Sequence, residues 1–416
     1  MTGRPVLDHV PEYAFALAAL VAPPLAVLVP YGMAVELPIL GVISAAMLWR
    51  RRQFRLVPVR ALALVGVLCA WAVVTLVWAL GPDHGAVTIF RVAALALAGV
   101  LAMGMARLGD LGGSRLLLAG LAVGVVAATV LLVADVTTGN GLSAEVARFK
   151  GALPLPESWK SQLNRGATVL ALLVWPLALL VWRQRWRWLL ASIVLAMVAL
   201  LFVDSFATRL AMGSGAVTLL VVRAWPTAGL RVLKGMLVVA TLALPQVMPR
   251  LPAPPVTFDS MPWLPLSAHH RLVIWHFAAE RIAEHPLWGW GMDASRTIPG
   301  GDETVWIEDY YPLTHGVRRV ISGALMPLHP HNAILQWRLE LGVPGALAAA
   351  VALWCLVGRI QRSPELDRGG RATAAAVCVA GMVVSCVSYG AWQSWWLASL
   401  WLAAALCLAA GRRRTP

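Results

Sequence analysis

Apolar runs of about 20 residues, the length with which an α-helix crosses a bilayer, recur from one end of this chain to the other. Hydrophobic residues make up 59% of the 416 residues and charged residues only 13%, which excludes an ordinary soluble globular protein. Lipid offers the backbone no hydrogen-bonding partner, and the alternating pattern of barrel strands is absent, so each run must be helical. We therefore predict an all-α, polytopic membrane bundle of about 12 transmembrane helices, with one large loop that contains short helices.

The predicted helices are joined mostly by short loops and form a single integral membrane domain over residues 1–416. We expect no cleavable signal, because a second apolar run follows the first directly. Prolines interrupt the first two runs. The spans are placed near residues 13–29, 31–48, 61–80, 85–105, 115–136, 166–182, 188–203, 210–225, 233–247, 333–357, 372–390 and 392–410.

The net charge of +14 is distributed as a topology signal. Arginines gather in alternate short loops, such as residues 50–60, 183–187 and 412–414, and the positive-inside rule places these loops and both termini in the cytoplasm. The two long connections, residues 138–165 and 248–332, then face the periplasm, and the larger one joins spans 9 and 10. This distribution argues against a nucleic-acid partner and leaves membrane lipids as a secondary one.

The larger loop enters the tenth span through His329-Pro330-His331-Asn332. If residues 331–345 are helical, one face of that helix carries His331 together with Arg338, Gly342 and Gly345. The positive end of the helix macrodipole disfavours imidazolium, so we expect His331 to stay neutral and able to accept a proton. An interfacial histidine that merely caps a helix is the simpler alternative.

The spacing His331-Asn332, nine residues, Gly342, two residues, Gly345 resembles a motif of the bacterial O-antigen ligase family. About twelve spans with one dominant periplasmic loop extend the resemblance over most of the chain. It implies transfer of a glycan from undecaprenyl diphosphate to the sugar core of lipid A, on the periplasmic face of the inner membrane, with no metal or other cofactor. By this resemblance His331 is the catalytic base, and His329, Asn332 and Arg338 are substrate-binding candidates.

A departing undecaprenyl diphosphate needs fixed cations, and arginine suits this role because it is always charged and bidentate toward phosphate. Arg271 is the leading candidate, since on a helix starting near Ser267 it shares a face with apolar Trp275, Ala278 and Ile282. Snorkelling to lipid headgroups is the alternative for each arginine. The candidates at predicted periplasmic helix ends are Arg165, Arg209 and Arg271.

Other functions also fit these sequence features. O-antigen polymerases and protein O-oligosaccharyltransferases belong to the same superfamily. A transporter or flippase of lipid-linked sugars is the alternative from another class, although ionisable residues here lie mostly at the outer rim of the predicted bundle. A metal site built from His329, His331 and the acidic residues of 302–309 is disfavoured, because proline separates the histidines and no H-E-x-x-H helix is present.

Three further expectations concern side chains in or near the spans. Arg91 lies inside the fourth span and needs a partner, for which Asp135 and Asp204 are candidates. Glu340 is expected to orient the bundle rather than touch substrate. Tryptophans near span ends are typical of interfacial anchors: Trp175, Trp182, Trp188, Trp392, Trp395 and Trp396.

Overall fold

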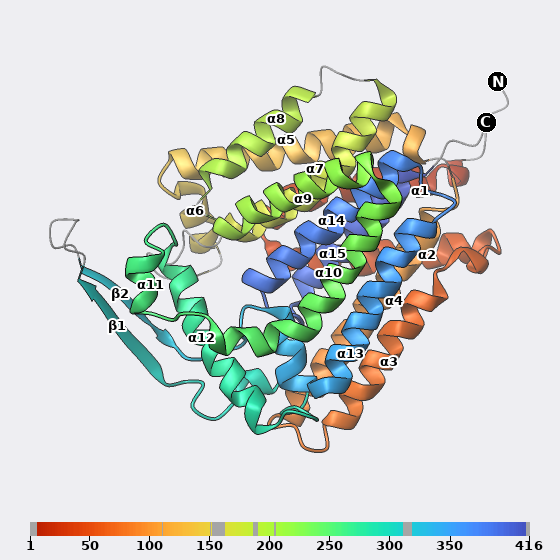
Figure 1. The fold of residues 1–416 in the computed structure, drawn as a ribbon. Coiled ribbons are helices and arrows are strands. Elements are labelled where there is room, and N and C mark those ends of the chain that lie inside the picture. The colour runs from red at the N-terminus through yellow and green to blue at the C-terminus, as the bar shows by residue number, and fades with distance from the viewer. Residues whose placement is uncertain are drawn as a thin grey trace.

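The computed structural model of the chain describes residues 6–109, 111–149, 151, 163–185, 190–203, 205–310 and 318–412. These residues form a helical bundle with one two-stranded sheet (Figure 1). Within the described residues, ten helices are long and apolar enough to cross a membrane, and two shorter helices are also apolar. The chain is therefore a multi-pass membrane protein with the predicted all-α architecture.

Every predicted span coincides with a helix, and α3 and α8 are the two shorter ones. The helices of the bundle are α1 (Val10–Leu28), α2 (Met33–Arg50), α3 (Val59–Thr75), α4 (Pro82–Met105), α5 (Arg115–Thr137), α7 (Leu163–Gln184), α8 (Leu190–Phe202), α9 (Phe206–Ala224), α10 (Pro226–Val247), α13 (Ala333–Arg362), α14 (Arg368–Val387) and α15 (Ser394–Gly411).

The large loop between α10 and α13 holds more regular structure than the short helices predicted for it. It contains the short α11 (Val256–Ser260) and the longer α12 (Leu266–Glu284), which begins one residue before the predicted start. It also contains a hairpin, in which β1 (Thr304–Tyr310) pairs antiparallel with β2 (Arg318–Ala324). The smaller loop holds α6 (Gly141–Phe149). Residues 152–162 and 311–317 of the two loops lie outside the described residues.

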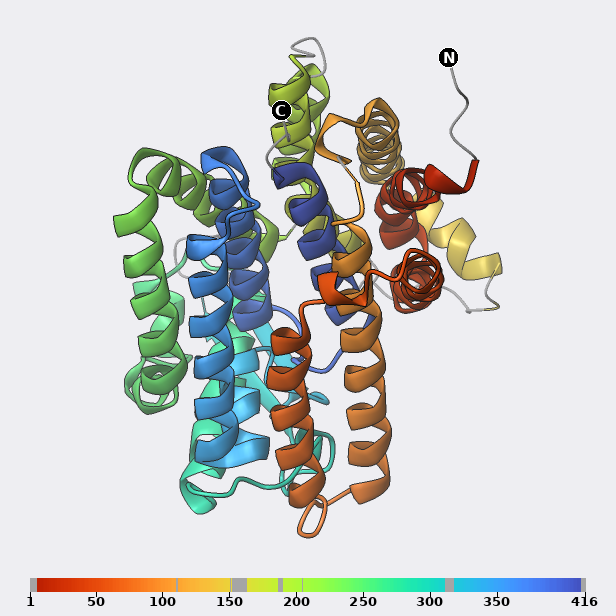
Figure 2. The same cartoon turned by 90° about the vertical axis from the view of Figure 1, so that its right-hand side faces the viewer.

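Two groups of helices build the bundle. α10, α13, α3 and α4 run side by side, each in contact with the next, and α12 and its neighbouring segments cover one end of this group (Figure 2). α7 is the most enclosed of the candidate spans and packs against α1, α5, α8, α14 and α15. The largest apolar cluster of the chain lies around α7. This close packing holds the side chains near the loop-facing ends of α7 and α15 in fixed positions.

The tryptophan prediction is wrong for three residues. Trp175, Trp395 and Trp396 are only 4%, 2% and 1% exposed, so they are core residues rather than interfacial anchors. Inside the core the indole N–H of Trp396 donates to Ser385 Oγ at 2.9 Å, and that of Trp395 donates to Gln393 Oε1 at 3.1 Å. Trp182 is exposed as predicted, and Trp188 lies outside the described residues.

Asp135 does not pair with Arg91. Its carboxylate accepts hydrogen bonds from the backbone N–H and the hydroxyl of Ser143, at 2.7 and 2.6 Å, and so ties α5 to α6. Arg91 is on the exposed side of α4. The other predicted partner, Asp204, lies outside the described residues.

Candidate active site

His331 lies just before α13, not within it. α13 begins at Ala333, and Asn332 caps it, its Oδ1 accepting from the backbone N–H groups of Ile334 and Leu335 at 3.0 and 3.1 Å. The backbone φ of His331 is +52°, which turns its side chain out of the helical path. Oδ1 of Asn332 is thus engaged by the cap, which fixes the start of α13 directly after His331.

One ring nitrogen of His331 is fixed by the backbone. Nδ1 lies 2.5 Å from the carbonyl oxygen of Ser388, which follows α14. A carbonyl can only accept a hydrogen bond, so Nδ1 carries the hydrogen and Nε2 presents its lone pair. Among the described residues no group hydrogen-bonds to Nε2. The ring is therefore held in the tautomer that a general base requires.

The pKa of His331 is lowered to about 3, so the imidazole is neutral at physiological pH. Burial is the largest cause, and the neighbouring His329 and the guanidinium of Arg271 act in the same direction. The neutral state agrees with the expectation from the sequence. Burial is the dominant cause of the lowered pKa, in place of the helix macrodipole that was expected to keep His331 neutral.

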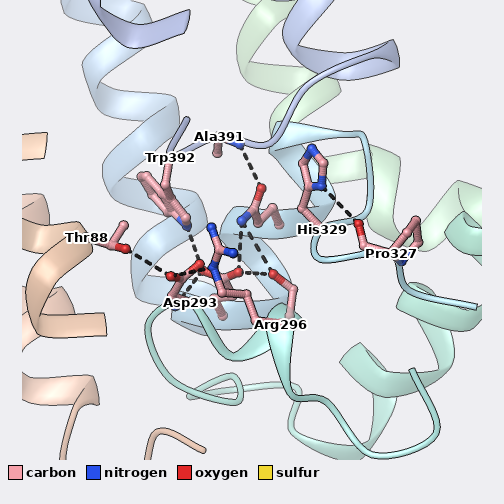
Figure 3. A network of polar contacts seen from close by, with 10 residues as sticks. Thr88, Asp293, Arg296, Pro327, His329, Ala391 and Trp392 are labelled. Atoms are coloured by element: carbon pink, nitrogen blue, oxygen red, sulfur yellow. Dashed lines mark hydrogen bonds and ion pairs between the residues drawn. The ribbon is translucent and has the colours of Figure 1, made fainter. Parts of the chain in front are cut away.

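His329 packs against His331, with ring centroids 4.4 Å apart, and both of its nitrogens have partners. Nδ1 lies 3.2 Å from the Pro327 carbonyl oxygen, as Figure 3 shows, and Nε2 lies 3.0 Å from the amide nitrogen of Gln393. Gln393 in turn accepts from Trp395, which fixes the direction of its amide. Burial is the main reason that the pKa of His329 falls to about 4. His329 therefore supports its neighbour through a neutral, fully paired ring.

Arg271 on α12 brings a positive charge to the histidines. Its charge lowers the pKa of both His331 and His329, so the guanidinium lies within electrostatic reach of both rings. It lines a cavity of about 200 Å³ whose other walls are apolar, among them Trp275 and Val387. No carboxylate of the described residues pairs with it. The predicted apolar surroundings of Arg271 are confirmed, and an anion is the ligand that such a group favours.

Tyr389 joins the site from the segment after α14, and sequence reasoning missed it. Its hydroxyl lies 3.4 Å from Thr168 Oγ1, and its ring packs edge-on against Trp395. Burial raises the pKa of the phenol, while Thr168 and the charges of Arg165 and Arg271 act in the opposite direction. The two arginines, from α7 and α12, therefore converge on Tyr389.

The remaining predicted arginines differ in position. Arg165 lies over the rings of Tyr31 and Trp395, with its guanidinium carbon 5.1 and 6.0 Å from their centroids. Arg209 is on the exposed side of α9, next to Ala207, which lines the cavity beside Arg271. Arg338 donates to the backbone carbonyl of Pro286. The structure thus assembles Arg271 and Arg165 with the histidines and directs Arg338 elsewhere.

The prediction of one continuous helix over 331–345 is wrong, because α13 is broken at Gly342, where φ is +64° and ψ is −155°. Pro344 has no N–H, so it cannot donate to the carbonyl of Glu340. Backbone N–H groups of another segment take over: Trp290 donates to Leu339 and Gly291 to Glu340, both at 2.9 Å. A Cβ at Gly342 would collide with that segment. The glycine therefore allows the loop 287–291 to approach α13 closely.

Glu340 is a buried hub that holds the surroundings of His331 in place. Its carboxylate accepts from Trp392 Nε1 at 2.6 Å, from the Asp293 backbone N–H at 2.9 Å and from Gln336 Nε2 at 2.9 Å (Figure 3). Gln336 Oε1 accepts from the backbone N–H of Ala391 at 2.7 Å. These bonds join α13 to the segment 388–393, which supplies the partners of both histidines. Glu340 orients the structure, as the sequence suggested.

Part of the chain is similar in sequence to a known protein family. A family model described as O-antigen ligase matches residues 162–350. Over this segment the chain is similar to the O-antigen ligase family. The matched O-antigen ligase segment contains Arg165, Arg209, Arg271 and His331. Ser388 and Tyr389 come from outside it and complete the site.

Curated proteins with a ligase name are also similar to the chain. Proteins named "Putative polysaccharide ligase" from Rickettsia conorii and Rickettsia prowazekii are 30% and 29% identical to the chain, over 247 and 252 residues. One from Rickettsia felis is 27% identical over 247 residues. Each match covers 58% of this chain and 56% of the relative, so the chain spans about half the length of the curated relatives it matches.

The hypothesis of a metal site gains no support from the described residues. Nowhere in that part of the chain do three or more His, Cys, Asp or Glu side chains gather as metal ligands. His329 has both ring nitrogens engaged by other groups. The side chains of Glu308 and Asp309 lie outside the described residues.

Proposed function

We propose that this protein acts as an O-antigen ligase, which transfers a glycan from undecaprenyl diphosphate to a sugar of the lipid A core at the periplasmic face of the inner membrane. The observation that carries the proposal is the neutral His331 near the guanidinium of Arg271, with Nδ1 tied to Ser388; no group among the described residues hydrogen-bonds to Nε2, and no carboxylate among them pairs with Arg271. A positioned base and a fixed cation in one partly apolar site are the two elements that such a transfer needs.

In the proposed reaction, His331 Nε2 takes the proton from an acceptor sugar hydroxyl as its oxygen attacks the anomeric carbon of the donor glycan. The bond between that carbon and the diphosphate oxygen breaks, and the electron pair leaves with undecaprenyl diphosphate. One displacement of this kind inverts the anomeric configuration. Metal-independent catalysis is part of the proposal, since the arginines supply positive charge to the leaving group.

Arg271 is proposed to hold the diphosphate, with Arg165 and the Tyr389 hydroxyl as further contacts and Arg209 at the entrance of the site. The apolar cavity beside Arg271 accommodates the first part of the lipid chain. We also propose that both termini are cytoplasmic and that residues 248–332 are periplasmic, because the positive-inside rule places the arginine-rich short loops in the cytoplasm.

The pH profile of transfer tests the environment of His331. Because the pKa of His331 is lowered to about 3, the base stays neutral as pH falls, so donor kcat/KM should stay level from about pH 8 to about pH 5. Bound diphosphate adds negative charge near the ring and raises this pKa, so the acid limb of kcat should lie at higher pH than that of kcat/KM. An acid limb of kcat/KM at the ordinary histidine pKa would contradict the buried, neutral base.

Reconstitution tests the proposed function itself. Proteoliposomes containing the purified full chain, an undecaprenyl-diphosphate-linked glycan and lipopolysaccharide without O-antigen should produce glycan-bearing lipopolysaccharide, visible as a shifted ladder on a gel. Lengthening of the lipid-linked glycan instead would identify a polymerase. Glycan on serine or threonine would identify a protein oligosaccharyltransferase, and movement of the donor without a new glycosidic bond would identify a transporter. Each of these three results overturns the ligase proposal.

A further inference from the structure

A second and larger cavity lies at the end of α3, away from Arg271. Its volume is about 620 Å³, within the range of ligand-binding pockets. Four indole rings line it, two from the end of α3 and the turn after it, Trp71 and Trp78, and two from the loop after α12, Trp288 and Trp290. Trp71 is the centre of the set, with its ring centroid 6.1 Å from that of Trp78 and 5.9 Å from that of Trp288.

Three of the four indole rings, those of Trp71, Trp78 and Trp290, are fixed by hydrogen bonds to backbone carbonyls. Trp71 Nε1 donates to the Leu341 carbonyl at 2.9 Å, Trp78 Nε1 to Gly289 at 3.2 Å and Trp290 Nε1 to Arg281 at 2.8 Å. Their polar N–H groups are therefore used within the protein, and they present the faces and edges of their rings to the cavity. Rigid aromatic surfaces of this kind lose little entropy on binding a flat apolar face.

The lining suits an uncharged ligand. No Asp, Glu, Lys or Arg side chain is among the described residues that line the cavity. The one titratable group among them is His285, whose ring packs edge-on against that of Trp290 with the ring centroids 4.2 Å apart. Phosphate groups of a lipid therefore find no cation there. Trp71 and Val74 in the last turns of α3, with Trp78 and Leu80 just after it, place the cavity at the C-terminal end of that helix. Sugar rings combine neutral charge with apolar C–H faces that stack on indoles.

The cavity is joined to the candidate active site through α13. The loop that carries Trp288 and Trp290 is hydrogen-bonded to the break at Gly342, and Ala333–Leu341, a helical segment about 12 Å long, separates that break from His331. α12 with Arg271 lies on one side of this segment and α3 on the other (Figure 1). A transfer between two lipid-linked substrates needs two approaches to one base, and the two cavities are lined by different elements on either side of this segment, α12 and α3.

We propose that the indole-lined cavity binds the sugar chain of the lipid-linked acceptor, while the cavity beside Arg271 takes the donor. This inference rests on the proposed transferase function. It assigns Trp288, a residue that is 57% exposed and whose ring packs on Trp71, as an acceptor-binding residue that plays no part in the chemistry.

Acceptor titrations of the full chain in proteoliposomes test this assignment, with lipopolysaccharide lacking O-antigen as the acceptor. Trp288→Ala should raise the KM for this acceptor about fivefold or more, with kcat and the KM for donor unchanged. Trp288→Tyr, which keeps an aromatic face, should restore most of the affinity. Trp225→Ala is the matched control, because Trp225 is similarly exposed, at 65%, but lies at the junction of α9 and α10.

A binding measurement separates this inference from the proposed function. Quenching of tryptophan fluorescence by the same acceptor should persist in a His331→Asn protein, which has the cavity but lacks the base, and should weaken when Trp288→Ala is added. If Trp288→Ala and Trp225→Ala show the same acceptor KM and the same quenching, the indoles are an interfacial belt and the acceptor site is refuted. If the wild-type protein binds the acceptor but shows no transfer activity, the proposed function is overturned instead.

Discussion

Replacing His331 with asparagine should lower the rate of glycan transfer by about a hundredfold to ten-thousandfold, the range expected for loss of a general base. Asparagine suits this position because it tolerates positive φ, and φ is +52° at His331. Its side-chain N–H can still donate to the Ser388 carbonyl, as Nδ1 now does. The substitution removes the proton acceptor Nε2 and keeps the local structure.

The measurement is the initial rate of transfer in proteoliposomes at saturating donor and acceptor, together with the melting temperature of the purified protein. His84→Asn is the matched control, since His84 is an exposed histidine at the start of α4, and its rate should equal that of the wild type. Both variants should melt with the wild type. Wild-type turnover by His331→Asn would remove the base from the mechanism.

The transmembrane helices could be predicted from the sequence because an apolar segment of that length has one stable backbone conformation in lipid. The start of α12 near Ser267 was also predictable from the end of a proline-rich stretch. The break in α13 was missed, although Pro344 signals it: proline has no N–H and disfavours helical backbone at the residue before it. Helical periodicity over 331–345 concealed that local signal.

The partners of the histidines could not be predicted. Ser388 lies 57 residues from His331, and Gln393 lies 64 residues from His329, so each contact depends on how α13, α14 and α15 pack. Tyr389 carries no charge and belongs to no recognisable pattern. The burial of Trp395 was missed for a related reason, since a tryptophan near a span end is interfacial or buried according to which helices surround it. Local sequence suggested His331 and Arg271 as the candidate base and cation, and the packing of distant helices determines their geometry.

Replacing Arg271 with glutamine should lower kcat/KM for the donor by about a hundredfold to a thousandfold, the usual effect of removing one fixed donor to a developing anion. The guanidinium is the cation that acts on both histidines, and no carboxylate of the described residues neutralises it. Arg271→Lys should recover only part of the activity, because an ammonium lacks the bidentate geometry that matches phosphate. Arg281→Gln is the control on the same helix, since Arg281 pairs with Glu284 at 3.0 Å.

A second measurement distinguishes loss of the phosphate contact from loss of structure. The charge of Arg271 lowers the pKa of His331, so its removal should move the acid limb of kcat/KM to higher pH in Arg271→Gln, while Arg281→Gln leaves the limb in place. A misfolded site would lose activity without this upward shift. Unchanged donor kcat/KM in Arg271→Gln would show that the diphosphate binds elsewhere, because Arg271 is the one charged side chain among the described residues that line this cavity.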